Sequence, residues 1–191
     1  MTPATQRLLP YATNMVRLDH THVVAAFHQY RTTDSPRIKR GLADQICIAL
    51  EVHAQLEEEI FYPAVRAVSD DEAVQKSVPE HDEMRRLIAR LRSLSADDPA
   101  FDNTFMELMR DVLHHVADEE TILLPMAERL LQDRLGELGL AMTRRRLELV
   151  VPRSLEVASS IARSVSWSTV ATVAATATAV AALCVARQRR Y

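Results

Sequence analysis

Apolar residues recur at intervals of three and four along four long segments of the chain, which is the spacing of one face of an α-helix. The pattern predicts helices over roughly residues 14–32, 36–68, 71–95 and 99–135. Residues that favour helix N-termini stand near each start: Asn14, Ser35 before Pro36, Asp70 or Asp71, and Asp98 before Pro99. Because the connections are short, we expect an up-down-up-down four-helix bundle that closes near Gly136 and Gly139, followed by an extra C-terminal helix.

The composition supports an all-α fold class. Only 3 of the 191 residues are glycine and 5% are aromatic, whereas residues that favour helices over strands are abundant. Cys47 and Cys184 are too few for a disulfide framework, and no C-x-x-C motif suggests a thiolate metal site. The first residues lack the apolar core of a signal peptide, so we expect a cytoplasmic protein.

The charge is distributed unevenly along the chain. Residues 1–143 carry 15 basic and 24 acidic side chains, a balance of −9, whereas residues 144–191 carry 8 and 2, a balance of +6. We therefore divide the chain into a bundle over 1–143, an Arg-rich linker over 144–163 and an uncharged C-terminal helix with a basic end over 164–191. An acidic body without clustered basic residues argues against nucleic acid as a partner.

The C-terminal segment is a candidate membrane anchor. Residues 164–186 contain no charged side chain, and these 23 residues are enough to span a bilayer as a helix. Their many Ala, Thr and Ser residues make the segment weakly hydrophobic, whereas Trp167 and the flanking arginines are typical of a membrane boundary. The spacing of Val170, Val173 and Val180 also fits a helix that packs on a protein partner, so both interpretations stand.

A short internal repeat lies in the second and fourth predicted helices. The segment HAQLEEEIFYP at 53–63 aligns without gaps on HVADEETILLP at 115–125, so His, Glu, Glu and Pro coincide. The first and third helices each carry a further histidine, His20 and His81, which precede the repeat histidines by 33 and 34 residues. The body is therefore predicted to be a duplicated helical hairpin, in which the repeated proline kinks or ends each helix.

Four histidines and two glutamates are predicted to meet inside the bundle. They are His20, His53, Glu57, His81, His115 and Glu119. In each H-x-x-x-E pair the two residues are four apart, so they share one helix face, and that face is apolar in all four helices. A single buried histidine is usually a core residue with a satisfied hydrogen bond, but four in phase with two carboxylates indicate a metal site.

The donor types narrow the choice of metal. Imidazole and carboxylate without thiolate suit iron, manganese or zinc, and six ligands suit two ions with bridging carboxylates better than one crowded ion. Iron is the metal we expect. The ferritin-like di-iron bundle needs Glu-x-x-His on two helices, whereas the nearest spacing here, Asp111 to His114, occurs once and lies on a polar face.

The order H, H-x-x-x-E, H, H-x-x-x-E resembles the hemerythrin-like HHE cation-binding domain over roughly residues 14–135, including DH at 19–20 and EH at 80–81. The resemblance implies a non-haem di-iron centre with an oxo or hydroxo bridge. In it the four histidines would be terminal ligands, and Glu57 and Glu119 would bridge the irons. Oxygen-carrying members have a second histidine one turn after the first on the third helix, where this sequence has Arg85.

Other side chains are weaker candidates for that missing ligand. Three histidines are predicted to be surface or outer groups: His22, His28 and His114. Tyr62 would point away from His53 in a straight helix, so only a kink at Pro63 would bring it in. Glu58 and Glu120 occupy matching repeat positions, and either a solvated face or a hydrogen bond to a ligand histidine would explain them.

By this resemblance, the chain is expected to bind or react with dioxygen, hydrogen peroxide or nitric oxide, with catalase-like turnover as one form of that chemistry. The alternative is a sensing or metal-binding module without turnover, whose C-terminal segment reports iron or oxygen status to a membrane partner. Metal buffering ranks last, because it needs more carboxylates than this interior offers.

Overall fold

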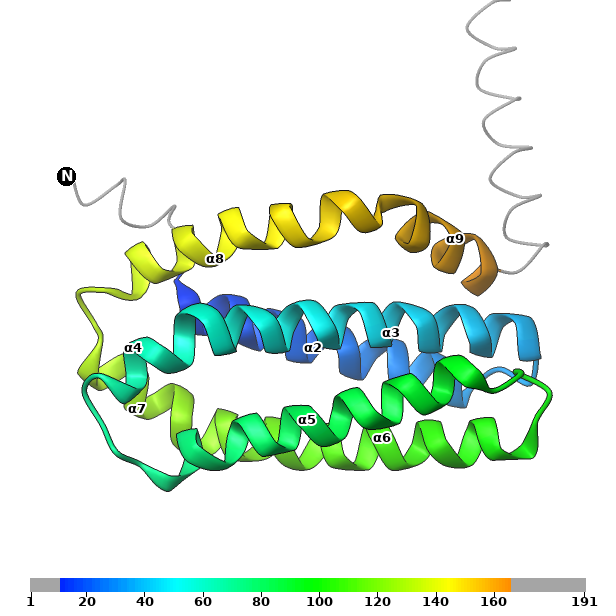
Figure 1. Cartoon of the computed structure of the whole chain (residues 1–191), viewed down its shortest axis with the longest axis horizontal. Coiled ribbons are helices and arrows are strands. Elements are labelled where there is room, and N and C mark those ends of the chain that lie inside the picture. The colour runs from blue at the N-terminus through cyan, green and yellow to red at the C-terminus, as the bar shows by residue number, and fades with distance from the viewer. Residues whose placement is uncertain (1–10, 166–191) are drawn as a thin grey trace, which may run out of the picture.

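The structure is a computed structural model that describes residues 11–165, and successive long helices in it run antiparallel (Figure 1). In chain order, the elements are α2 (Ala12–Arg31), α3 (Pro36–Leu56), η1 (Glu57–Phe61), α4 (Tyr62–Arg66), α5 (Glu72–Ser93), α6 (Pro99–Asp118), η2 (Glu119–Leu123), α7 (Leu124–Leu130), α8 (Leu135–Val150), η3 (Val151–Arg153) and α9 (Ser154–Ser164). The prediction of an all-α four-helix bundle followed by further helix is confirmed: within the described residues the further helices are α8 and α9, whereas the helix expected over 164–191 lies almost wholly outside them.

Three bundle helices begin at the predicted caps. Ser35, Asp71 and Asp98 each accept a backbone N–H of the first turn, at 3.5, 2.9 and 2.8 Å respectively. These bonds satisfy donors that the helix itself leaves without partners. The first helix instead begins at Ala12, directly after Tyr11, which makes no side-chain cap.

The second and fourth predicted helices pass through the repeated prolines by a local change of helix type. Each turns into a five-residue π-helical segment, η1 or η2, in which the closing N–H of Tyr62 or Leu124 bonds to the carbonyl five residues earlier. The proline, which lacks an N–H, follows one residue later. At the repeated proline, where a kink or an end of the helix was predicted, the helix therefore changes type, and it does so in both halves of the repeat.

The apolar core consists of two clusters with the polar site between them. One cluster includes Phe61, Tyr62, Leu123 and Leu124, and the other includes Phe101 and Phe105. Along α2, along α5 and along α6 with η2, the site histidine separates buried residues of the two clusters, and in α3 the change from one cluster to the other falls next to His53, at Val52. The site is thus enclosed by apolar packing at both ends of the bundle.

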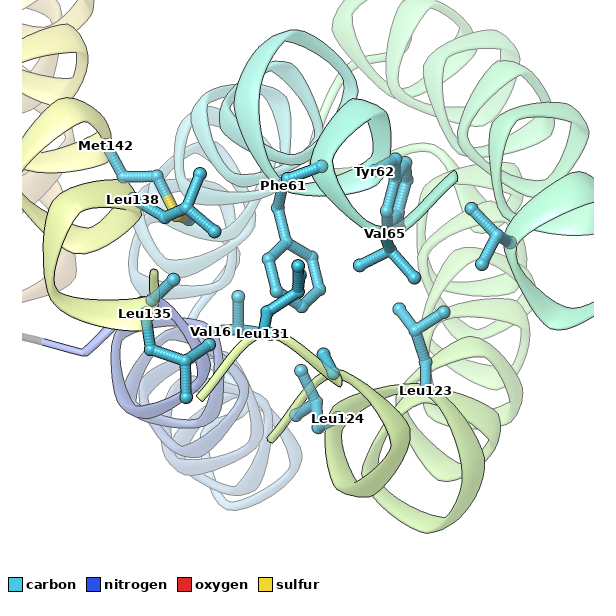
Figure 2. Packing of buried hydrophobic residues seen from close by; sticks show 14 of the residues in the cluster. Val16, Phe61, Tyr62, Val65, Leu123, Leu124, Leu131, Leu135, Leu138 and Met142 are labelled. Atoms are coloured by element: carbon cyan, nitrogen blue, oxygen red, sulfur yellow. The ribbon is translucent and has the colours of Figure 1, made fainter. Parts of the chain in front are cut away.

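A further layer, α8 and α9, covers the α2–α3 side of the bundle (Figure 1). Figure 2 shows Leu138 and Met142 reaching from α8 toward the bundle end that contains Phe61. At the other end α9 lies so close to α3 that a Cβ built on Gly41 would be 2.4 Å from the backbone nitrogen of Ser164. Residues 144–163, expected as an Arg-rich linker, lie in this layer.

None of the helices within residues 11–165 is both long and apolar enough to cross a membrane. The candidate anchor over 164–186 falls almost wholly outside the described residues.

Candidate metal centre

The six residues predicted from the sequence converge in the middle of the bundle, and every one of them is buried: His20, His53, Glu57, His81, His115 and Glu119. Their donor atoms form two groups in which all atoms lie within 4.8 Å of one another. One group contains His20, His53, Glu57 and Glu119, and the other contains Glu57, His81 and His115. Glu57 belongs to both, so the two groups of donors share one carboxylate.

Each histidine directs its Nε2 atom toward a carboxylate at the centre. Glu119 Oε2 lies 3.1 Å from His20 Nε2 and 3.4 Å from His115 Nε2. Glu57 Oε2 lies 3.2 Å from His53 Nε2 and 3.5 Å from His81 Nε2. Each carboxylate thus faces one histidine of its own helix, four residues earlier, and one from a different helix.

The outer Nδ1 atom of each histidine meets a second carboxylate. The four pairs are His20 with Glu120 at 2.8 Å, His53 with Asp19 at 3.4 Å, His81 with Glu58 at 2.8 Å, and His115 with Glu80 at 2.7 Å. A carboxylate accepts the Nδ1–H and so leaves the Nε2 lone pair of a neutral imidazole free for a metal. Of the two roles left open for Glu58 and Glu120, the structure shows the hydrogen bond to a site histidine.

Arginines hold three of these four outer carboxylates. Arg17 lies 3.1 Å from Glu120 and also pairs with Glu128. Arg85 makes two contacts with Glu58, at 2.6 and 2.7 Å, so the residue at the position of the missing histidine supports a carboxylate that faces His81. Arg146 contacts both oxygens of Asp19, at 2.8 and 2.5 Å.

Tyr62 points into the site, in contrast to the expectation for a straight helix. Its hydroxyl donates to Glu119 at 2.8 Å or to Glu57 at 3.0 Å, and it is 3.4 Å from His81. In the π turn, the backbone hydrogen bond of Tyr62 reaches back five residues to Glu57 instead of four. This wider turn rotates the phenol toward the histidines. Burial, together with Glu57 and Glu119, raises the pKa of Tyr62 well above its ordinary value, so the hydroxyl keeps its proton in this environment.

Burial and close neighbours shift the pKa values of several groups at the centre. Burial and neighbouring histidines lower the pKa of His81 to about 2, so its imidazole is neutral. Burial and the charge of Glu119 raise the pKa of Glu57 well above its ordinary value, and its Oε1 atom has no hydrogen-bond partner among the described residues. Although burial opposes it, the contact with His20 and the neighbouring His115 and His53 lower the pKa of Glu119 to about 2.

The closest pair of histidines, His81 and His115, gives the strongest geometric reason to expect a cation at the centre. The Nε2 atoms of His81 and His115 are 3.1 Å apart, while both Nδ1 atoms face carboxylates that require an N–H. Two neutral imidazoles with their protons on Nδ1 would bring two lone pairs together. A cation bound to both nitrogens removes that repulsion, and imidazole with carboxylate is a donor set that suits iron and other transition metals.

Some residues considered from the sequence lie outside this centre, and some residues around it were not predicted. The other three histidines considered from the sequence are exposed: His22, His28 and His114. Sequence reasoning did not assign contacts to Asp19, Glu80, Arg17 or Arg146. Asp19 and Glu80 each directly precede a site histidine, and this adjacency was the available signal. The arginines come from distant positions that carry no such signal.

A four-helix bundle with a buried His/Glu site defines the class of this protein, and comparison with known proteins gives its family. Residues 11–127 match the Hemerythrin HHE cation binding domain, and the chain belongs to this family. The DNA nickase of Nostoc sp. is 31% identical over 110 residues, which are 58% of this chain and 31% of that protein, so the chain matches under a third of its relative.

The structural comparison supports the fold. The crystal structure of a Hemerythrin HHE cation binding domain-containing protein, the Rv2633c homolog from Mycobacterium kansasii, aligns with a TM-score of 0.66 at 17% identity. The alignment covers 80% of this chain and 98% of that one. It therefore extends beyond the length of the matched family domain.

Proposed function

We propose that the centre holds two iron ions and that it binds or reacts with dioxygen, hydrogen peroxide or nitric oxide. The observation that carries the proposal is the pair of donor groups that share Glu57. In this assignment His20, His53, His81 and His115 are terminal ligands, and Glu57 and Glu119 bridge the ions. When bound, a di-iron pair supplies reversible one-electron steps at each ion, which suits small oxidants.

The protein's own residues determine what reaches that pair. The two apolar clusters exclude bulk water, and the outer carboxylates fix the orientation of all four imidazoles. Tyr62 holds a proton on an oxygen that contacts both Glu57 and Glu119, so the centre has a hydrogen-bond donor that does not come from solvent. Arg85 takes the place of a histidine ligand on α5, which leaves fewer protein ligands than in the oxygen carriers and favours reaction over simple carriage.

Iron counting and spectroscopy test the proposal. Full-length protein from iron-supplemented cells is expected to contain two irons per chain and to show visible absorption that recovers after repeated additions of peroxide, with release of dioxygen. His53→Ala is expected to lose iron, whereas His28→Ala, at an exposed histidine, is the matched control. Two irons without dioxygen release would favour gas binding or sensing. An iron-free protein would contradict the proposal.

We do not extend the activity named for the Nostoc relative to this chain. The chain matches 31% of that protein, and residues 1–143 of this chain have a balance of −9, which opposes contact with phosphates. We therefore propose small oxidants, and not nucleic acid, as the partners of this chain.

A further inference from the structure

Arg146 connects the α8–α9 layer to the metal centre. It lies on α8, beyond the residues 11–127 that match the family domain. Its Nη1 and Nη2 atoms contact Oδ1 and Oδ2 of Asp19 at 2.8 and 2.5 Å, and Asp19 Oδ2 lies 3.4 Å from His53 Nδ1. A continuous chain of contacts therefore runs from the added layer to the imidazole of His53.

The geometry of this chain favours orientation of the imidazole. A guanidinium that contacts both oxygens fixes the plane of a carboxylate, which a single lysine nitrogen does not do. The side chain of Asp19 is 15% exposed and that of Arg146 is 30% exposed, so the pair is partly shielded from competing water. The Nε atom of Arg146 is buried without a hydrogen-bond partner among the described residues, so Asp19 is the group that offsets the burial of this guanidinium.

We propose that Arg146 is a positioning residue for His53. By holding Asp19, it keeps the proton of the neutral imidazole on Nδ1 and directs the Nε2 lone pair toward Glu57. The part of this inference that concerns metal retention rests on the proposed di-iron function, whereas the tautomer of His53 belongs to the protein alone. Arg17 and Arg85 support two other outer carboxylates from inside the matched domain, so Arg146 is the contribution of the added layer to the same arrangement.

The test compares full-length Arg146→Met and Arg146→Lys with Arg144→Met. Arg144 is the matched control because it belongs to the same run of arginines on α8 but is exposed. Two-bond proton–nitrogen correlation spectra of the metal-free protein report which nitrogen of His53 carries the proton. A competing chelator reports how fast the loaded protein gives up iron.

Arg146→Met is expected to change His53 from a single Nδ1–H tautomer to a mixture and to weaken iron retention by roughly tenfold or more, as changes to the partners of metal ligands do. Arg146→Lys is expected to lie between the wild type and Arg146→Met, and Arg144→Met to match the wild type. Circular dichroism verifies that the variants remain helical. If Arg146→Met does not fold, Asp19→Asn keeps the side-chain volume and is expected to give the same mixed tautomers.

An unchanged His53 tautomer and unchanged iron retention in a folded Arg146→Met protein would overturn the inference. A wild-type protein that holds no iron, but whose His53 tautomer still depends on Arg146, would overturn the di-iron proposal and leave the positioning role supported. The two failures are therefore distinguishable.

Discussion

At the scale of single residues, Tyr62 is a difference between the two halves of the repeat that bears directly on the site. Its counterpart is Leu124, which is also fully buried but offers no hydrogen bond. One hydroxyl proton therefore serves two buried carboxylates, Glu57 and Glu119. The centre is therefore asymmetric, because the repeat position that carries a hydroxyl in one half is apolar in the other.

Removal of this hydroxyl is expected to destabilise the metal-free protein. Tyr62→Phe leaves carboxylate oxygens unsatisfied in the interior, which costs about 1–3 kcal/mol of the free energy of unfolding. Chemical denaturation of the metal-free variant measures the loss. Tyr30→Phe is the control, because Tyr30 donates to Asp102, whose side chain is 49% exposed and can bond to water instead. Equal losses in both variants would mean that Tyr62 does not stabilise the buried carboxylates.

At the scale of helices, the close approach of α9 to α3 depends on the absence of a side chain at Gly41. A Cβ there would lie 2.4 Å from Ser164 N and 2.7 Å from the carbonyl carbon of Arg163, and both are backbone atoms that cannot rotate away. The contact between α3 and α9 is extensive, so a change at this one position bears on the docking of the whole helix.

Gly41→Ala is therefore expected to loosen α9 while the bundle remains folded. Backbone amides over residues 154–164 should exchange roughly tenfold faster or more, with little change in α6. Hydrogen exchange read by mass spectrometry measures both segments in one experiment. Gly136→Ala, in a half-buried position of α8, carries the same substitution into another helix and should leave α9 protected. Unchanged exchange in α9 of the Gly41 variant would show that this approach is not required for docking.

The geometry of single helices explains which features could be predicted from the sequence and which could not. Helical periodicity is local, so it placed His20, His53, His81 and His115 correctly on inward faces, and the caps at Ser35 and Asp98 followed from short-range chemistry. The π turns were not predicted, because the pattern assumes 3.6 residues per turn at every position. The inward direction of Tyr62 was consequently expected only if the helix were kinked at Pro63.

Contacts between residues that are far apart in the sequence could not be predicted from helical periodicity. Arg146 reaches Asp19 across 127 positions, and nothing in its neighbourhood distinguishes it from Arg144 or Arg145. Its partner is determined by how α8 lies on α2 and α3, which depends on tertiary packing and on the close approach at Gly41. Periodicity indicates which residues face inward, but it does not indicate which inward-facing residues meet.

At the scale of the whole molecule, the centre draws on all four bundle helices and on α8. The donors and their supporting residues lie between Arg17 and Arg146, within the described part of the chain. Within residues 11–165, the tertiary structure therefore divides the chain differently from its charge, because the site draws on residues from both sides of the change of sign near residue 144.

Two truncations test this division. A chain that ends at residue 165 is expected to retain iron and any peroxide turnover at the full-length level, because it keeps all the donors and supporting arginines found within residues 11–165. A chain that ends at residue 143 loses Arg146 together with α9, so it should release iron to a chelator roughly tenfold faster or more and unfold at a lower temperature. Iron loss from the 165-residue chain would show that residues 166–191 contribute to the centre. Full retention by the 143-residue chain would show that the family domain holds the metal without the added layer, and Arg146 would then have no role in retention.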